Sequence, residues 1–365
     1  AQQFVMAPDI ERAQQRSQLP TNQVYRHSYD MLGEAALSAQ DAERYFTAYM
    51  AAIQSLGETA QETDLFNRPS ISVKLSALHP RYEHAQRDRV LIELVPRILT
   101  LAKHASRVNI GVTLDAEEAD RLELSLDIFA AVFNDPSLKY CQGFGLAVQA
   151  YQKRALCVLD WLASLARQQQ RRIPVRLVKG AYWDTEIKRA QVQGLAGYPV
   201  FTHKAATDVS YLACARRLLA ARDVFYPQFA THNAHTVAYI MEQAGTIRDF
   251  EFQRLHGMGE SLYSELVGPD KFNVACRVYA PVGNETDLLP YLVRRLLENG
   301  ANTSFVHRLA DEKAPIKKII SDPVQEMNMV KNRLNERVPL PIHLYGDVRR
   351  NSQGINFADP LEITK

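Results

Sequence analysis

The stretch GFGLAVQAYQKRALCVLDWLASLARQQQRRIPVRLVKGAY (143–182) decides the fold. It contains a β-rich run (143–151), an apolar helical stretch (155–166) and a second β-rich run (173–182). A helix that joins two strands over so short a distance is typical of a βαβ unit, in which the two strands are parallel. The stretch therefore predicts a parallel sheet.

The same alternation continues on both sides of this unit. Apolar residues recur at helical spacing at about 86–105 and 122–133. Further β-rich runs lie at 71–78, 109–117, 224–233, 249–257 and 275–283, with ANTSFV (301–306) as the eighth run. The runs are apolar at both alternate positions, which indicates strands that are covered on both faces.

Eight βα units favour a closed barrel over an open doubly wound sheet. The nucleotide-binding motifs G-x-G-x-x-G and G-x-x-x-x-G-K-[ST] are absent; Gly143 and Gly145 come closest but lack the third glycine. We therefore expect an α/β chain with a (β/α)8 (TIM-like) barrel at 61–310. An N-terminal helical arm (1–60) would precede it, and a C-terminal helix with an irregular, proline-containing tail (311–365) would follow.

Composition excludes several other classes. The 365 residues are 46% hydrophobic and 23% charged, and the net charge of +2 weakens any interpretation as a nucleic-acid binder. No apolar run reaches the ~18 residues of a membrane span, and the N-terminus lacks the pattern of a secretory signal. The four cysteines form no C-x-x-C pair, so we expect them to be reduced and the protein to be cytoplasmic.

Polar residues stand near the end of nearly every β-rich run. In a barrel, the carboxyl ends of the strands and the loops after them line the active site. The sequence therefore predicts a functional rim that contains Lys74, Ser76, Asp115, Gln149, Arg176, Lys179, Tyr182, Thr231, His232, Asn233, Gln253, His256 and Tyr279. Taken singly, each residue also has a structural interpretation, such as a helix cap for Asp115.

Arginines are the most informative residues of the pattern. Arg176 lies inside an apolar run, so it needs either a carboxylate partner or an anionic or electron-rich ligand. Arg294 and Arg295 are adjacent on the helical stretch 285–298, where Glu298 can brace either guanidinium. Two neighbouring arginines can hold a carboxylate or phosphate through paired hydrogen bonds, although such a pair is also common on a solvated helix face.

Metal and serine chemistry have little support. His232 and His235 are three residues apart and His256 lies in the next run, but there is no H-E-x-x-H and no cysteine at ligand spacing. We expect no metal site. The G-x-S-x-G signature of a nucleophilic serine is also absent.

Seven long motifs resemble the proline dehydrogenase domain of the bifunctional flavoenzyme family called proline utilization A. The resemblance covers roughly residues 25–310. The motifs are SISVKLSALHPRY (70–82), LDAEEADRLE (114–123), VQAYQKR (148–154), RLVKGAYWDTEIKRAQ (176–191), YPQFATHNAHT (226–236), LHGMGE (255–260) and YLVRRLLENGANTSFV (291–306), to which SYDMLGEAAL (28–37) can be added.

This resemblance implies a distorted (β/α)8 barrel that holds FAD noncovalently at the carboxyl ends of its strands. It implies oxidation of L-proline to Δ1-pyrroline-5-carboxylate, the first step of proline catabolism, by hydride transfer to the flavin N5. A membrane quinone of the ubiquinone type would then receive the electrons. It also implies peripheral contact with the inner face of the cell membrane, whereas nothing in this chain resembles the family's second dehydrogenase domain or its DNA-binding module. We therefore expect one domain that is active in the first step only and binds no nucleic acid.

The resemblance also implies roles for particular residues. Arg294 and Arg295 would clamp the substrate carboxylate, with Lys74 as a further positive partner and Glu34 holding Lys74 or the substrate. The ring of proline would be walled by Tyr182, Leu255 and Tyr279.

The implied flavin site is larger. Its residues would be Asp115, Gln149, Arg176, Val178, Lys179, Gly180, Ala181, Tyr182, Trp183, Thr231, His232, Asn233, Gln253, Leu255, Glu298 and Ser304. The phosphates and adenosine would meet Thr202, His203 and Lys204. Some relatives have Arg where His203 stands, so the chain departs from the pattern there.

Two other functions compete with this one. A Schiff-base lyase or aldolase on the same barrel could use Lys179 or Lys74 as its amine. A noncatalytic or DNA-binding fragment is disfavoured by the near-neutral charge.

Overall fold

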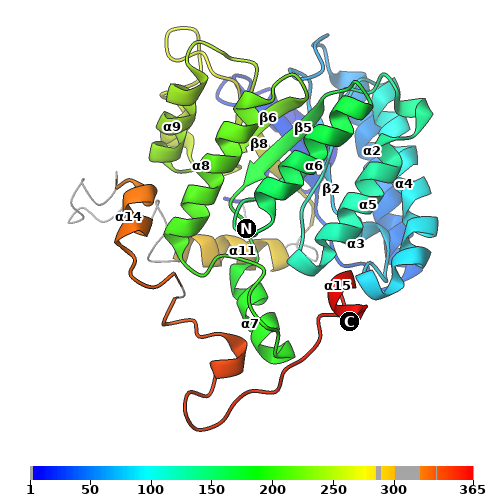
Figure 1. Ribbon diagram of the computed structural model, residues 1–365. Coiled ribbons are helices and arrows are strands. Elements are labelled where there is room, and N and C mark those ends of the chain that lie inside the picture. Colours follow the sequence, from blue (N-terminus) through cyan, green and yellow to red (C-terminus); the bar gives the residue numbers. More distant parts are fainter. Residues whose placement is uncertain (1–2, 285–288, 301–320, 334, 365) are drawn as a thin grey trace.

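Eight parallel strands close into a barrel in the computed structural model of the chain (Figure 1). The structure describes residues 3–284, 289–300, 321–333 and 335–364. The strands are β1 (Arg26–Met31), β2 (Ser70–Val73), β3 (Gly111–Leu114), β4 (Phe144–Gln149), β5 (Ile173–Val178), β6 (Phe225–Ala230), β7 (Glu251–Leu255) and β8 (Cys276–Val282). Each pairs with its neighbour in sequence, and β1 pairs with β8, which confirms the predicted (β/α)8 architecture.

The identity of the first strand corrects one prediction. Strand β1 lies inside the segment that was expected to be a purely helical arm, and its pairing with both β2 and β8 completes the barrel. The barrel therefore needs no strand at 301–306, and those residues lie outside the described part of the chain. The seven other predicted runs each contain a strand.

Helices surround the barrel. The longer helices are α1 (Ile10–Ser17), α2 (Ala39–Thr59), α4 (Arg87–Arg107), α5 (Leu122–Phe133), α6 (Ala155–Gln168), α7 (Trp183–Gln193), α8 (Lys204–Ala220), α9 (Ala234–Ala244), α11 (Leu289–Gly300) and α14 (Pro323–Met329). The short ones are α3 (Leu75–Leu78), α10 (Glu260–Tyr263), α15 (Pro360–Ile363) and the 3-10 turns η1 (His84–Gln86), η2 (Ala119–Arg121), η3 (Pro136–Leu138) and η5 (Pro341–His343). Among the described residues, no helix is both long and apolar enough to cross a membrane.

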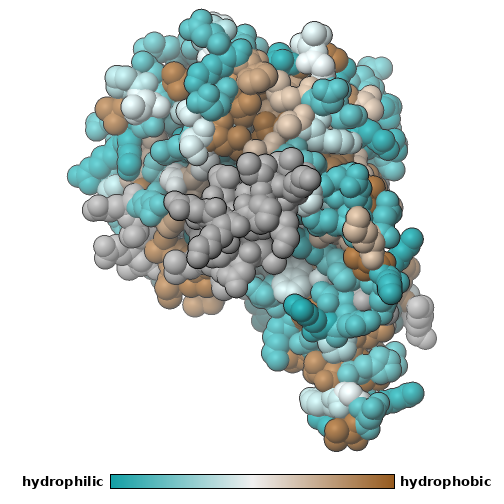
Figure 2. All heavy atoms as spheres, turned by 90° about the vertical axis from the view of Figure 1, so that its left-hand side faces the viewer, coloured by the Kyte–Doolittle hydropathy of each residue, from teal (hydrophilic) through white to brown (hydrophobic). Residues whose placement is uncertain are grey.

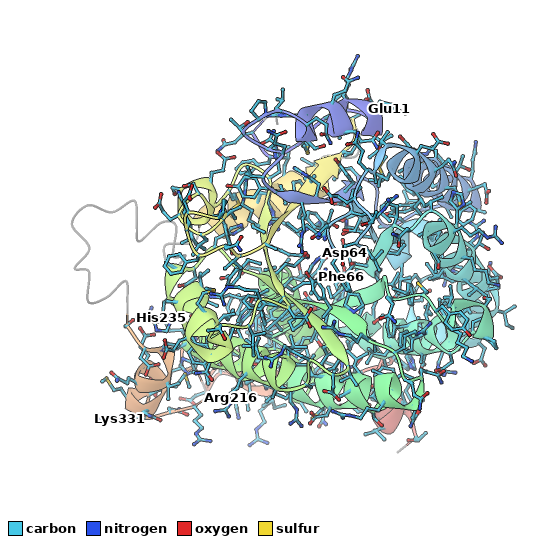
Figure 3. All side chains as sticks on the ribbon, turned by 90° about the horizontal axis from the view of Figure 1, so that it is seen from above. Glu11, Asp64, Phe66, Arg216, His235 and Lys331 are labelled. Atoms are coloured by element: carbon cyan, nitrogen blue, oxygen red, sulfur yellow. The ribbon has the colours of Figure 1, made fainter. Side chains whose placement is uncertain are left out.

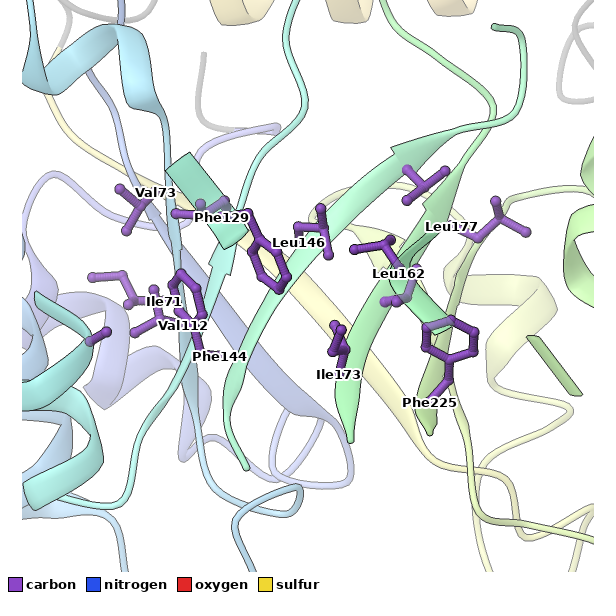
Figure 4. Close-up of a cluster of buried hydrophobic side chains, with 14 of the residues drawn as sticks. Ile71, Val73, Val112, Phe129, Phe144, Leu146, Leu162, Ile173, Leu177 and Phe225 are labelled. Atoms are coloured by element: carbon purple, nitrogen blue, oxygen red, sulfur yellow. The ribbon is translucent and has the colours of Figure 1, made fainter. Parts of the chain in front are cut away.

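The two faces of the strands differ in polarity, contrary to the prediction that both are apolar. Outward-facing side chains such as Ile71, Val112 and Ile173 pack with Phe129 of α5 and Leu162 of α6 in the main hydrophobic core (Figure 4). The inward-facing positions are largely polar. This pattern places the core between the sheet and its helices and leaves hydrogen-bonding side chains inside the barrel.

The amino end of the barrel is closed by the loop before β2. Phe66 stacks on Tyr226 with ring centroids 3.7 Å apart, and Asp64 and Phe66 lie over the middle of the barrel in Figure 3. Below them, the fully buried Arg277 donates to both carboxylate oxygens of Glu251, at 2.7 and 3.0 Å. This end is sealed by packing and a buried ion pair, so the opposite, carboxyl end is where a ligand can enter.

Helix α7 projects from the carboxyl end of the barrel together with the C-terminal tail (Figure 1). The space-filling view shows a protrusion below the body of the molecule (Figure 2). Tail residues 335–354 bind along it: the amide of Asn351 donates to the carbonyl of Gln191, and the backbone N–H of Gly354 donates to the carbonyl of Gly194. The predicted C-terminal helix is present as α14, and the tail that follows is mostly irregular.

Candidate active site

A charged cluster fills the carboxyl end of the barrel, and it is centred on Asp115. One carboxylate oxygen of Asp115 accepts a hydrogen bond from Arg176 at 2.6 Å. The other accepts from the Tyr279 hydroxyl at 2.6 Å and from Lys74 at 3.2 Å. Lys74 also donates to Asp30 at 2.6 Å. Two cations and two carboxylates, from β1, β5 and the ends of β2 and β3, thus meet beside the side chain of Tyr279.

The cluster sets the charge of its members. Burial by itself raises the pKa of Asp115, but Lys74 and Arg176 outweigh it and hold that pKa below its usual range. Burial by itself lowers the pKa of Lys74, but Asp30 and Asp115 raise it well above the usual value. Burial raises the pKa of Asp30, which shares Lys74 with Asp115. Lys74 is therefore an ammonium and Asp115 a carboxylate at neutral pH.

Arg176 has protein partners on every side of its guanidinium. Beyond Asp115, it donates to Gln253 at 2.7 Å and to the hydroxyls of Ser72 and Ser28 at 2.8 and 3.3 Å. Of the two interpretations that the sequence left open for Arg176, the structure shows the carboxylate partner. Its guanidinium also lies over the Tyr279 ring at 5.1 Å, so the charge is placed at the rim of the predicted pocket.

Helix α11 brings the predicted carboxylate clamp to the same opening. Arg294 donates two hydrogen bonds to the carboxylate of Glu34, at 2.6 and 2.7 Å, and lies 5.5 Å from the centre of the Tyr182 ring. Glu34 was predicted to hold Lys74 or the substrate; in the structure its hydrogen-bond partner is Arg294 instead of Lys74, and its contact with the substrate stays a prediction. Arg295 is buried, with its guanidinium 5.3 Å from the centre of the Tyr291 ring.

Two predicted flavin residues fall outside this description. The side chain of Glu298 and the whole of Ser304 belong to the part of the chain that the structure does not describe. Their predicted roles stay predictions.

A second cationic group lies at the amino end of α8. Lys179, after β5, and Lys204, in the first turn of α8, both donate to the carboxylate of Asp208; the Lys204 contact is 2.7 Å. The residue before the helix is His203, which makes no side-chain cap. Its Nε2 atom is buried and has no hydrogen-bond partner among the described residues. An uncapped helix amino end with two lysines is suited to phosphate oxygens.

The segment between β5 and α7 passes close to Tyr151. Gly180 has φ +136°, and a Cβ atom there would lie 2.4 Å from the Tyr151 ring, so this position requires glycine. Val178 and Ala181 flank the turn, and the indole N–H of Trp183 donates to the carbonyl of Phe201. This contact joins the predicted flavin segment 178–183 to residues 201–204, where the phosphates are expected.

The predicted rim residues after β6 have partners within the protein, in agreement with the structural interpretation that each of them also allowed. The Asn233 side chain caps α9 by accepting from two backbone N–H groups, and the Thr231 hydroxyl accepts from the N–H of Asn233. The Nε2 atom of His232 accepts from the N–H of Leu255 at 3.1 Å, which ties the two loops together. The amide of Gln149 likewise donates to the carbonyl of Glu117.

Asp30, Ser28, Ser72 and Asp208 are members of the site that the sequence analysis missed. Asp30 and Ser28 occupy alternate positions of the quoted motif SYDMLGEAAL, as do Ser72 in β2 and Lys74 directly after it. That alternation was the signal that could have found them. Asp208 lies one helical turn after Lys204, which is the spacing of a helical ion pair.

The residues of the site suit FAD as the cofactor. The two lysines and the uncapped helix suit a diphosphate, the unpartnered Nε2 of His203 offers a further polar contact, and the turn at Gly180 allows close approach of the backbone. The described residues contain no cluster of three or more His, Cys, Asp or Glu side chains that could hold a metal ion. Three of the four cysteines are buried and none forms a disulfide.

Comparison with known proteins assigns the chain to a family. The sequence model of the family described as proline dehydrogenase matches residues 13–308. The bifunctional protein PutA of Klebsiella aerogenes is 50% identical over 98% of this chain, and proline dehydrogenase 1 of Bacillus subtilis is 27% identical over 84% of it. The chain spans 28% of the length of the first relative and 89% of the second.

Solved structures show the same similarity. A structure of proline utilization A with proline bound in remote sites superposes with a TM-score of 0.93, at 55% identity, over 99% of this chain and 37% of the other. Proline utilization A from Bdellovibrio bacteriovorus, inactivated by N-propargylglycine, gives a TM-score of 0.83 at 30% identity. The resemblance and the barrel fold that the sequence predicted are thereby confirmed.

Proposed function

The chain belongs to the proline dehydrogenase family, and from this premise we propose that it catalyses the FAD-dependent oxidation of L-proline to Δ1-pyrroline-5-carboxylate. The reaction removes a hydride from the ring carbon beside nitrogen and a proton from the nitrogen. The observation that carries the proposal is the meeting of Arg294, Lys74 and Arg176 with Tyr182 and Tyr279 at the open end of the barrel. Cations beside flat aromatic walls suit a small, ring-shaped amino acid.

Substrate binding would depend on the two arginines of α11. Glu34 orients Arg294, so a substrate carboxylate would meet a guanidinium that is already fixed. Arg295 would supply the second set of donors, while Tyr182, Leu255 and Tyr279 would line the ring. The ammonium of Lys74 adds positive charge without leaving its own carboxylate partners.

When bound, FAD supplies the hydride acceptor at its N5 atom. Lys179, Lys204 and the amino end of α8 would hold its phosphates, and residues 178–183 with Arg176 and Gln253 would hold its ring system. Asp115 keeps the charge of Arg176 in place. Because Asp115 already accepts from Arg176, Lys74 and Tyr279, its role would be to orient these groups rather than to take a proton.

We also propose the fate of the electrons and the location of the protein. By resemblance to its family, the chain would pass electrons to a membrane quinone of the ubiquinone type. It would work in the cytoplasm, in peripheral contact with the inner face of the membrane. Vesicles that contain ubiquinone should reoxidise the proline-reduced protein, whereas vesicles without quinone should not.

The competing lyase is disfavoured by the state of Lys74. A Schiff base forms from a neutral amine, and the two carboxylates around Lys74 keep it protonated. Lys179 is paired with Asp208. Borohydride should therefore trap no covalent adduct when it is added with a carbonyl substrate.

The test of the proposed function is product formation. The chain, saturated with FAD, is incubated with L-proline and an electron-accepting dye, and an aromatic amine traps the cyclic imine. We expect proline-dependent reduction of the dye with one equivalent of trapped imine. Dye reduction without imine, or no reaction with proline, would overturn the proposal.

A further inference from the structure

Two substrate-facing elements leave the barrel side by side. Helix α7 begins directly after Tyr182, and the loop 115–121 after β3 begins with Asp115. Tyr182 faces Arg294, and Asp115 holds Arg176, Lys74 and Tyr279. The relative placement of helix and loop therefore determines how the aromatic wall lies against the charged cluster.

A buried carboxylate connects these elements. Glu186, on the first turn of α7, is 3% exposed, and its Oε1 accepts a hydrogen bond from the backbone N–H of Ala119 at 2.7 Å. Ala119 is 2% exposed, and its carbonyl accepts from the guanidinium of Arg154 at 3.2 Å. The middle of the loop is thus fixed to α7 on one side and to the start of α6 on the other.

Glu186 is also tied to Tyr182 through the helix itself. The N–H of Glu186 donates to the carbonyl of Tyr182 at 2.9 Å, in the first hydrogen-bonded turn of α7. Glu186 therefore connects the backbone carbonyl of Tyr182 to the backbone N–H of Ala119. Ala119 lies four residues after Asp115.

We propose that Glu186 is a positioning residue for proline oxidation, which holds the Asp115 loop against the helix that carries Tyr182. The inference rests on the proposed function. It predicts that loss of the Glu186 acceptor loosens the loop and weakens substrate binding, while the barrel and the phosphate-binding end of α8 stay intact. A buried N–H without an acceptor is unfavourable, so the loop would move to find another partner.

The electrostatics of the position support this role. Burial raises the pKa of Glu186 to about 7, opposed by the Ala119 N–H. Asp120 and Glu118 on the loop raise this pKa further, and Arg189 on α7 lowers it. Burial, followed by the negative charge of Glu186, in turn raises the pKa of Tyr151. The hydrogen bond of a carboxylate is stronger than that of a neutral acid, so the link weakens as the pH falls below 7.

The chain offers a matched control on the same helix. Arg189 pairs with Asp120 of the same loop, but the two side chains are 31% and 29% exposed. An ion pair that is open to solvent contributes little. Because Arg189 lowers the pKa of Glu186, the comparison is made at pH 8, where Arg189→Gln should leave the loop in place although Arg189 touches the same two elements.

The test compares Glu186→Ala, Glu186→Gln and Arg189→Gln. We expect Glu186→Ala to raise the KM for proline about tenfold with little change in kcat, and to speed amide hydrogen exchange in residues 115–121. Glu186→Gln keeps an acceptor and should restore KM to within about twofold at pH 8. The wild-type KM should rise between pH 8 and pH 6 relative to that of Glu186→Gln, because only the wild type titrates there.

Three outcomes would overturn the inference. They are unchanged hydrogen exchange in residues 115–121 of Glu186→Ala, an unchanged KM, and a Glu186→Gln variant as impaired as the alanine. If Glu186→Ala does not fold, the KM values of the wild type and Glu186→Gln at pH 8 and pH 6 decide the question: an equal change in both proteins would overturn the inference. Hydrogen exchange is measured without substrate, so failure of the proposed function, seen as an inactive wild type, is distinguishable from failure of this link.

Discussion

Arg295 is the residue at which the substrate clamp can be tested most simply. It is buried beside Tyr291, on the same turn of α11 as Arg294. A paired, charge-assisted contact with a carboxylate contributes about 3 kcal/mol, so Arg295→Ala should raise the KM for proline roughly 100-fold. Steady-state kinetics check this. Arg295→Lys keeps the positive charge but loses the paired donors of the guanidinium, so its KM should lie between those of the wild type and Arg295→Ala. A normal KM in Arg295→Ala would refute the clamp.

His27 gives a prediction about pH and stability. Burial, followed by the charges of Arg277 and Arg254, lowers the pKa of His27 to about 3. The unfolded chain takes up a proton below pH ~6.5 and the folded chain does not, so this group destabilises the fold as the pH falls from ~6.5 towards 3. At pH 5 the loss is about 2 kcal/mol.

Urea unfolding at pH 7 and pH 5 measures that loss. The His27→Gln variant should lose about 2 kcal/mol less than the wild type between these two pH values. Equal losses in the two proteins would show that His27 is already neutral in the unfolded chain or charged in the folded one. His256, whose pKa burial lowers to about 4, should behave in the same way.

At the scale of single residues, the sequence predicted which residues belong to the site better than it predicted which side chains they bind. Lys74, Asp115, Arg176 and Tyr279 meet in the structure. Lys74 and Asp115 directly follow β2 and β3, whereas Arg176 and Tyr279 lie within β5 and β8. The pairing of Glu34 with Arg294 was missed because the two residues are 260 positions apart in the chain, and no local pattern links them. Partners across a barrel depend on register, which a single sequence does not display.

At the scale of elements, β1 shows why a strand can be missed in a sequence. Its sequence RHSYDM is largely polar, so it lacks the apolar run by which the other strands were found. Its outward residues pack against helices and its inward residues serve the charged cluster. The same reason explains the mistaken expectation of apolar residues at both alternate positions: the barrel interior is polar because it holds the site.

The contact between α7 and the C-terminal tail gives a prediction at this scale. A Cβ atom on Gly354 would lie 1.9 Å from the carbonyl oxygen of Gln193, so Gly354→Ala must push the tail away from the helix. We expect a loss of about 1–3 kcal/mol in the local stability of this contact, seen as faster limited proteolysis within 335–364.

Gly197→Ala is the control for this variant. No described atom lies within 4 Å of a Cβ placed at Gly197, so the substitution should leave the proteolysis rate unchanged. If Gly354→Ala is cleaved no faster than the wild type, the tail does not depend on its close approach to α7.

At the scale of the whole molecule, the fold assigns different tasks to the two ends of the barrel. The amino end is sealed by Phe66, Tyr226 and the buried pair of Glu251 with Arg277. A hydrogen-bonded path runs from Glu251 through Gln253 to Arg176 and Asp115. The periodicity of the sequence was sufficient to favour a (β/α)8 barrel and to locate seven of its eight strands, whereas the polar interior emerged only from the closed structure.

The visible spectrum of the purified chain, before and after L-proline is added without oxygen, tests the central claim most directly. Our account predicts flavin absorption bands that bleach when proline is added, because proline delivers a hydride to a cofactor held by the residues at the carboxyl end of the barrel. Flavin bands that persist with proline would contradict the proposed substrate. An absence of flavin bands, even after FAD is supplied, would contradict the account as a whole.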